Sequence, residues 1–140
     1  MTPSGILETV LSAADLDAAE TFYLNVLGFQ LHSKVPGRHI FFRCGEQMLL
    51  IFNPYETKKG PPLGALPVPP HGVVAASGAG HICFRASADE IARWRTQLER
   101  AGVAIESDFV WPASGGRSIY FRDPAGNSLE FAEAKIWGLA

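Results

Sequence analysis

The sequence of 140 residues lacks several features that mark specialised classes of protein. Its only two cysteines, Cys44 and Cys83, lie far apart and form no CxxC pair, so we expect reduced, buried thiols rather than a disulfide framework or a zinc knuckle. No apolar run approaches the roughly 18 residues needed to span a bilayer, and the start MTPSGILE has no basic stretch followed by an apolar one. We therefore expect a cytoplasmic protein without a membrane partner.

An excess of charge of one sign is also absent. The chain has 12 Lys and Arg against 14 Asp and Glu, and it lacks the basic surplus that nucleic-acid backbones attract. Hydrophobic residues make up 47% of the sequence, and a chain of this length buries about 68% of its unfolded surface, which is enough for a core. These properties predict one soluble globular domain without a nucleic-acid partner.

The chain repeats one order of predicted elements, β-α-β-β-β, with a period of about 74 residues. Module one, residues 5–53, is predicted to contain a strand at 6–12, a helix at 15–27, and strands at 29–34, 39–44 and 48–53. Module two, residues 80–134, is predicted to contain a strand at 81–85, a helix at 89–101, and strands at 103–107, 117–122 and 128–132. The matching segments LGF and AGV end the two helices, so we expect two modules that close on each other.

A connecting loop, residues 54–79, separates the modules and holds most of the prolines. Long loops of this kind in compact domains are often lids or binding loops. A passive tether between modules is an equally good interpretation, and the prolines would keep it extended.

Three residues with metal-binding side chains occupy related strand positions. His81 opens the first strand of module two, Glu8 lies at the corresponding position of module one, and Glu130 lies on the last strand of module two. Each also has a structural explanation: an exposed strand edge for Glu8, an arginine partner for Glu130, and a hydrogen-bonded core position for His81. Together they could supply two oxygens and one nitrogen to a divalent metal with open coordination positions.

Strand alternation gives two further sets of candidate residues. In module two it places Ser118, Tyr120 and Arg122 on one face of a strand. In module one it groups Arg43 with His39 and Phe41, and Arg43 could bind a substrate carboxylate if that face is the concave one. A solvated strand face is the alternative.

Three stretches resemble a known family. LETVLSAADLDAAETFYLNVLGF, GAGHICFRAS and YFRDPAGNSLEF are similar to signature segments of the vicinal oxygen chelate superfamily. That superfamily includes glyoxalase I, methylmalonyl-CoA epimerase, extradiol dioxygenases, fosfomycin-resistance transferases and bleomycin-resistance proteins. The resemblance implies an α+β fold, in which two paired βαβββ modules form a curved, partly open mixed sheet around a concave site, and it implies a homodimer.

The resemblance also implies four metal-ligand positions, which fall on Glu8, Leu50, His81 and Glu130. Leu50 has no donor atom, so the chain departs from the four-ligand pattern of glyoxalase I and the epimerase. Residues 112–114 are Pro-Ala-Ser and supply no histidine shortly before Tyr120, unlike the extradiol dioxygenases. The fosfomycin transferases share Ser118 and Tyr120, but their cationic positions are apolar here.

Our leading hypothesis is a metal-dependent, glyoxalase-like enzyme of the lyase or isomerase type. The metal (Mn, Fe, Co, Ni or Zn) would be held by Glu8, His81 and Glu130, and Glu8 or Glu130 would also act as the catalytic base. The residues expected to contact the small substrate are Arg43, Leu50, Phe52, Trp111, Ser118 and Tyr120.

Other functions remain open. Within the same superfamily, an extradiol-type dioxygenase or a fosfomycin-type transferase is the alternative. A different class is a metal-free sequestering protein that stacks an antibiotic or metabolite on Trp111, Phe52 or Tyr55.

Overall fold

The computed structural model describes residues 1–59, 64, 66 and 80–140, and the chain forms two compact units, Met1–Gly80 and His81–Ala140. The elements of the first unit are β1 (Glu8–Ser12), α1 (Leu16–Asn25), β2 (Gln30–Val35), β3 (His39–Cys44), β4 (Gln47–Phe52) and α2 (Pro54–Thr57). Those of the second unit are β5 (His81–Arg85), α3 (Ala88–Arg100), β6 (Ser107–Val110), β7 (Arg117–Arg122), β8 (Ser128–Ala132) and a short 3-10 helix (Ala134–Trp137).

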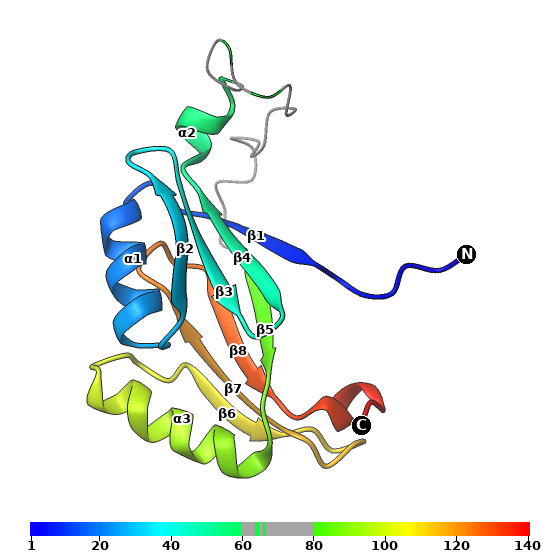
Figure 1. The fold of residues 1–140 in the computed structure, drawn as a ribbon. Coiled ribbons are helices and arrows are strands. Elements are labelled where there is room, and N and C mark those ends of the chain that lie inside the picture. Colours follow the sequence, from blue (N-terminus) through cyan, green and yellow to red (C-terminus); the bar gives the residue numbers. More distant parts are fainter. Residues whose placement is uncertain (60–63, 65, 67–79) are drawn as a thin grey trace. The chain divides into compact units, whose positions relative to one another are not determined.

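The first unit is a four-stranded sheet with α1 along one face (Figure 1). The strand order is β1-β4-β3-β2, with β1 parallel to β4 and the other pairs antiparallel. Asp15 caps α1 by accepting a hydrogen bond from the Ala18 backbone N–H at 2.9 Å. Tyr23 of α1 then packs on Phe42 of β3, with ring centroids 5.3 Å apart. The helix therefore covers one face of the sheet and leaves the side chains of the opposite face available for a site.

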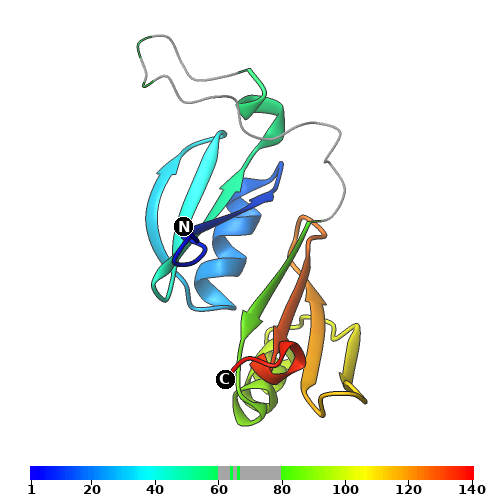
Figure 2. The same ribbon diagram turned by 90° about the vertical axis from the view of Figure 1, so that its right-hand side faces the viewer.

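The second unit repeats this plan, and the view in Figure 2 shows its sheet with α3 beside it. The strand order is β5-β8-β7-β6, with β5 parallel to β8. A capping box begins α3, because Ser87 and Glu90 exchange side-chain to backbone hydrogen bonds. Trp94 of α3 stacks on Phe131 of β8 at 4.6 Å, so the helix buries the face that carries Phe131. Glu130, the neighbour of Phe131 on β8, points to the other face.

The predicted position of one strand was wrong. We expected a strand at 103–107, but the structure places β6 at Ser107–Val110. The backbone N–H of Val103 bonds to the Leu98 carbonyl at 2.9 Å, which closes the end of α3 after Gly102 with φ of 74°. The extended pairing with β7 starts only at Glu106, whose N–H bonds to the Tyr120 carbonyl at 2.8 Å.

The α+β fold class is confirmed: each unit is a βαβββ module with an open, mixed sheet. The first residues of the connecting loop form α2. Most of the other residues of the loop lie outside the described part of the chain, so its expected role as a lid, a binding loop or a tether stays a prediction. None of the helices in the described ranges is long and apolar enough to cross a bilayer.

Candidate metal and substrate site

Glu130 is a buried carboxylate on the open face of the second sheet. Its residue is only 4% exposed, and its Oε1 is buried with no hydrogen-bond partner among the residues the structure describes. A buried charge without a partner is costly, so it is retained where something else supplies the partner. An arginine partner, which the sequence left open for Glu130, is not found among the described residues.

His81 faces Glu130 from the neighbouring strand. Its Nδ1 lies 3.1 Å from the Ser128 carbonyl oxygen, which can only accept, so Nδ1 carries a hydrogen. The other ring nitrogen, Nε2, lies 3.5 Å from Oε2 of Glu130. Together with Oε1, which has no hydrogen-bond partner among the described residues, this nitrogen and carboxylate are the donor types that a divalent metal takes. The half-exposed His81 side chain, at 51%, is not a core histidine.

Tyr120 and Cys83 flank the Glu130 carboxylate, because each is its direct partner across a strand pair. Burial, followed by the interaction with Glu130, raises the pKa of Tyr120 to about 12. Partial desolvation of the sulfur and the charge of Glu130 raise the pKa of Cys83 to about 12. Both groups therefore stay protonated at neutral pH and can act as hydrogen-bond donors beside the carboxylate.

Cys83 is the residue that sequence reasoning missed. We expected both cysteines to be buried; the thiols are free, but Cys83 is exposed and Cys44 is only partly buried. The signal was present in the sequence, because alternation along β5 places Cys83 on the same face as His81.

An aromatic row crosses the same face. The ring of His81 lies 6.2 Å from that of Tyr120, and the Tyr120 ring lies 6.1 Å from that of Phe109 at an interplanar angle of 3°. Phe109 in turn contacts Trp111 at 4.9 Å. The indole Nε1–H of Trp111 donates to Ser118 Oγ at 2.9 Å. The three expected substrate residues of module two, Trp111, Ser118 and Tyr120, thus lie on the same side of the sheet as Glu130.

The first unit has positions equivalent to those of His81 and Glu130, but different side chains occupy them. Glu8 pairs with Met48 as His81 pairs with Ser128. Two residues further along, Val10 pairs with Leu50 as Cys83 pairs with Glu130. The strand register therefore supports Leu50 as the equivalent of Glu130. Glu8 is exposed, and Leu50 is 7% exposed.

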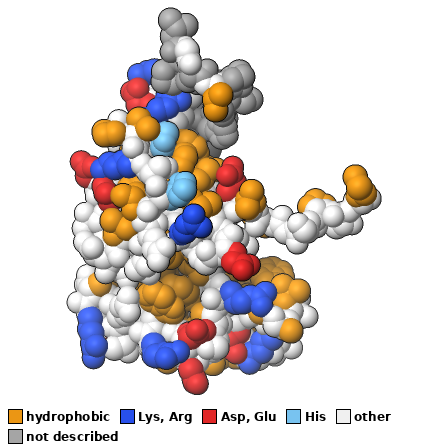
Figure 3. All heavy atoms as spheres, in the orientation of Figure 1, with side chains coloured by type: hydrophobic (Ala, Val, Ile, Leu, Met, Phe, Trp, Pro, Cys, Tyr) orange, Lys and Arg blue, Asp and Glu red, His pale blue; other side chains and the backbone are white. Residues whose placement is uncertain are grey.

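An aromatic cluster surrounds Leu50 on this sheet. Phe41, the partner of Leu50 on β3, stacks on His39 at 4.3 Å, and Phe52 meets both rings edge-on at 5.4 and 5.8 Å. Burial, and then the Arg38 charge, lower the pKa of His39 and favour its neutral ring. Figure 3 shows hydrophobic side chains beside a histidine where the strands of this unit face the viewer.

Arg43 and Tyr55, the remaining candidates, are exposed residues of the first unit. Arg43 lies opposite Met48 on β3 and makes no ion pair within the described part of the chain. Tyr55 belongs to α2, where the Lys58 ammonium sits 5.8 Å from its ring centroid. Arg43 is therefore available to an anionic group, whereas Tyr55 already has a cation over its ring.

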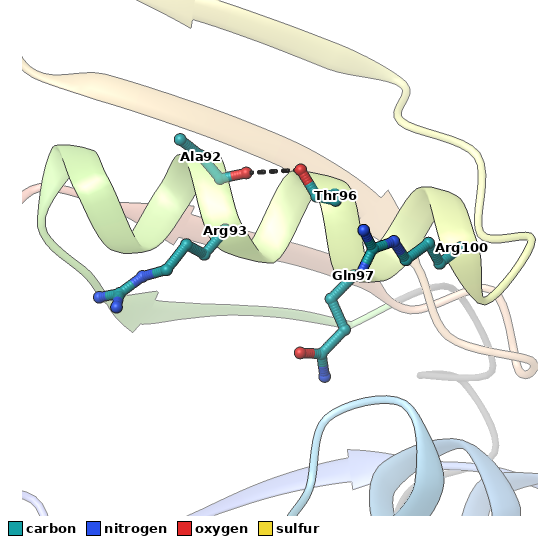
Figure 4. Close-up of a pocket in the computed structure, with 5 residues that line it drawn as sticks. All are labelled: Ala92, Arg93, Thr96, Gln97 and Arg100. Atoms are coloured by element: carbon teal, nitrogen blue, oxygen red, sulfur yellow. Dashed lines mark hydrogen bonds between the residues drawn. The ribbon is translucent and has the colours of Figure 1, made fainter.

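Within the described ranges, no three His, Cys, Asp or Glu side chains are gathered closely enough to hold a metal ion. The structure brings two of the three expected ligands together, His81 and Glu130, and places Glu8 at the matching position of the other unit. A separate hollow of about 530 Å³ runs along α3 (Figure 4). It is lined by Ala92, Arg93, Thr96, Gln97 and Arg100, and none of the expected site residues belongs to it.

Two βαβββ units with open, mixed sheets define the class of fold. The second unit carries an imidazole on its first strand beside a carboxylate on its last. The chain belongs to the Glyoxalase/Bleomycin resistance protein/Dioxygenase superfamily, whose family model matches residues 5–131. This is the vicinal oxygen chelate superfamily, so the family expected from the sequence motifs is confirmed.

Solved structures agree with this assignment. The chain is similar to the crystal structure of lactoylglutathione lyase from Agrobacterium tumefaciens, with 46% identity and a TM-score of 0.90 over 99% of this chain and 100% of that one. It is also similar to an integron cassette protein from the mobile metagenome of V. cholerae, with 26% identity and a TM-score of 0.69 over 96% and 98% of the two chains. A search of the curated proteins found no match.

Proposed function

We propose that this protein is a metal-dependent, glyoxalase-like enzyme of the lyase or isomerase type, acting on a small substrate with two adjacent oxygens. The observation that carries the proposal is the buried Oε1 of Glu130, which has no hydrogen-bond partner among the described residues and lies in the carboxylate that faces Nε2 of His81. The similarity to a lactoylglutathione lyase supports the same class of reaction.

The proposed metal ligands are His81 Nε2, a carboxylate oxygen of Glu130 and the carboxylate of Glu8. The nitrogen and oxygen donors suit Mn, Fe, Co, Ni or Zn in the divalent state. Such a metal, when bound, would polarise a substrate carbonyl and stabilise negative charge on the substrate oxygens. Leu50 has no donor atom, so it would not ligate the metal.

The chain's own residues would move the proton. In the isomerisation of an α-hydroxy carbonyl compound, Glu8 or Glu130 would take the proton from the hydroxyl-bearing carbon and return it to the neighbouring carbonyl carbon. The hydroxyl proton would pass to the former carbonyl oxygen, so that the proton count is conserved. The protonated hydroxyl of Tyr120 would donate a hydrogen bond to a substrate oxygen at this carboxylate. Arg43, without an ion pair in the described ranges, would hold an anionic group of the substrate.

The test is metal binding by His81→Ala, measured by elemental analysis after dialysis against each candidate metal. We expect about one metal per wild-type chain and none in the variant, because one of only three donors is removed. His32→Ala is the matched control, since His32 is an exposed histidine at the bulge of β2 and should leave metal content unchanged. Stoichiometric metal in folded His81→Ala would contradict the site.

A metal-free sequestering protein is the second candidate, favoured by the aromatic surfaces of both units. Wild-type protein that takes up no metal after supplementation, yet still binds aromatic ligands, would favour this function over the enzyme. No contact among the described residues supports a dioxygenase or a transferase.

A further inference from the structure

We propose that the aromatic row of the second unit, Tyr120, Phe109 and Trp111, binds an aryl group of the substrate. The substrate class is then a vicinal-oxygen compound with an uncharged aromatic substituent. This inference rests on the proposed function, because Glu130 and His81 would hold the oxygen-bearing end of the same molecule.

The first support is the continuity between the row and the Glu130 carboxylate. Tyr120 is the cross-strand partner of Glu130. Phe109 lies on β6, the strand beyond Tyr120 in the sheet, and the planes of the Phe109 and Tyr120 rings differ by 3°. Trp111 follows directly after the end of β6 and is 38% exposed. One ligand can therefore reach from the buried carboxylate to the edge of the sheet along aromatic side chains.

The second support is that Trp111 is held in place before any ligand arrives. Its indole N–H donates to Ser118 Oγ, and Ser118 itself is buried. Its backbone N–H donates to the Gly116 carbonyl at 2.8 Å, and its carbonyl accepts from the Gly115 N–H at 2.8 Å. A ring that is already ordered loses little conformational entropy when a ligand stacks on it.

The third support is the lack of a free cation on these strands. Arg85 donates to the Ala140 carbonyl oxygen, Arg117 pairs with Asp108, and Arg122 pairs with Glu106. Each arginine on the described strands of the second unit is thus already engaged. A carboxylate on the substituent would therefore find no unpaired arginine on the described strands of this unit, whereas an aromatic ring needs none.

The experiment compares two probes that differ only in the substituent, phenylglyoxylate and pyruvate. Their dissociation constants are measured by calorimetry on manganese-loaded wild-type protein, Trp111→Ala and Trp137→Ala. Trp137 is the control because it is an exposed tryptophan of the same unit that takes no part in the row. Melting curves establish that each variant is folded, and Trp111→Leu repeats the comparison with a side chain that stays apolar.

We expect phenylglyoxylate to bind about tenfold more tightly than pyruvate in the wild type and in Trp137→Ala, as ring stacking and burial predict. In Trp111→Ala that preference should fall to about twofold, with pyruvate affinity unchanged. Equal affinities for the two probes in the wild type, or a preference that survives in both Trp111 variants, would overturn the proposal.

A third probe, 2-phenylethanol, separates this inference from the proposed function. It carries the ring but no pair of chelating oxygens, so its binding should weaken in Trp111→Ala whether or not manganese is present. If phenylglyoxylate binding is independent of manganese while both aryl probes still depend on Trp111, the metal function fails and the aryl site stands. If manganese strengthens the binding of both keto acids but Trp111 has no effect, the aryl site fails and the metal function stands.

Discussion

At the scale of single residues, Leu50 distinguishes the two halves of the candidate site. It occupies the register position that Glu130 has in the second unit, and its neighbours there are Val10 and Phe41 rather than Cys83 and Tyr120. The first unit therefore offers apolar contact where the second offers donor atoms, apart from the carboxylate of Glu8.

Leu50→Glu tests whether this position faces the metal. We expect tighter metal binding and fewer bound waters, because a carboxylate replaces water as an oxygen ligand. Metal affinity is measured by titration, and melting temperature is recorded in parallel.

Leu49→Glu is the control for Leu50→Glu, because Leu49 is a buried neighbour on the opposite face of β4. A carboxylate there should cost several kcal/mol without any gain in metal binding. If Leu50→Glu behaves like Leu49→Glu, position 50 does not face the metal.

At the scale of elements, α3 is defined at its start by side chains that pair locally. Ser87 accepts from the Glu90 N–H at 3.3 Å, and Glu90 accepts from the Ser87 N–H at 2.8 Å. The boundary between β5 and α3 is thus specified within four residues of sequence.

Ser87→Ala should destabilise the protein by about 1 kcal/mol, because it leaves an N-terminal backbone N–H of α3 without an acceptor. Ser87→Asp should retain most of the stability, since its carboxylate oxygen replaces the hydroxyl as acceptor. Urea unfolding of the three proteins measures the difference. Equal stability of Ser87→Ala and the wild type would mean that the cap contributes nothing.

An ion-pair cluster joins β6 to its neighbours. Asp108 accepts hydrogen bonds from Arg117 Nε and Nη2 at 2.9 and 2.8 Å, and it also pairs with Arg95 of α3. The hydrogen bonds from Arg117, followed by that from Arg95, lower the pKa of Asp108 below its ordinary value.

This lowered pKa predicts a pH dependence of stability. Ionised Asp108 stabilises the folded state fully above the ordinary Asp pKa of about 3.9, and the contribution is lost as the pH falls through the lower folded value. The stability difference between wild type and Asp108→Asn should therefore be constant from pH 7 to about 5 and shrink below about pH 4. Denaturant unfolding at each pH measures it, and a difference that grows on acidification would contradict the assignment.

At the scale of the whole molecule, the described structure leaves apolar side chains exposed on edge strands. Val10 lies on β1, and Leu31 and Val35 lie on β2, the two edges of the first sheet. Exposed apolar residues on a sheet edge favour pairing with another surface.

We therefore expect a homodimer, which light scattering at micromolar concentration would report as twice the chain mass. Val35→Lys and Val10→Lys, one on each edge, should identify the edge involved, because a lysine at a buried dimer contact weakens association. A monomeric mass for the wild type at that concentration would contradict the prediction.

The sequence by itself determined the elements whose signals are local. The caps at Asp15 and Ser87 and the family motifs follow from residues a few positions apart, and the duplicated order is a series of such local signals that occurs twice. The α+β fold and the candidate ligands Glu8, His81 and Glu130 could therefore be predicted. The position of β6 could not, because the bond from Val103 to Leu98 and the pairing of Asp108 with Arg117 depend on how the end of α3 meets the sheet.

Only the tertiary structure decided which side chains meet at the site. Strand pairing places Cys83 and Tyr120 on either side of Glu130 and aligns Phe109 with Tyr120, and among the described residues Oε1 of Glu130 has no partner. These contacts join strands that are distant in sequence, and alternation alone defines a shared face within one strand but not the register between strands. Register, rather than composition, therefore makes a buried carboxylate into a candidate metal ligand with an aromatic surface beside it.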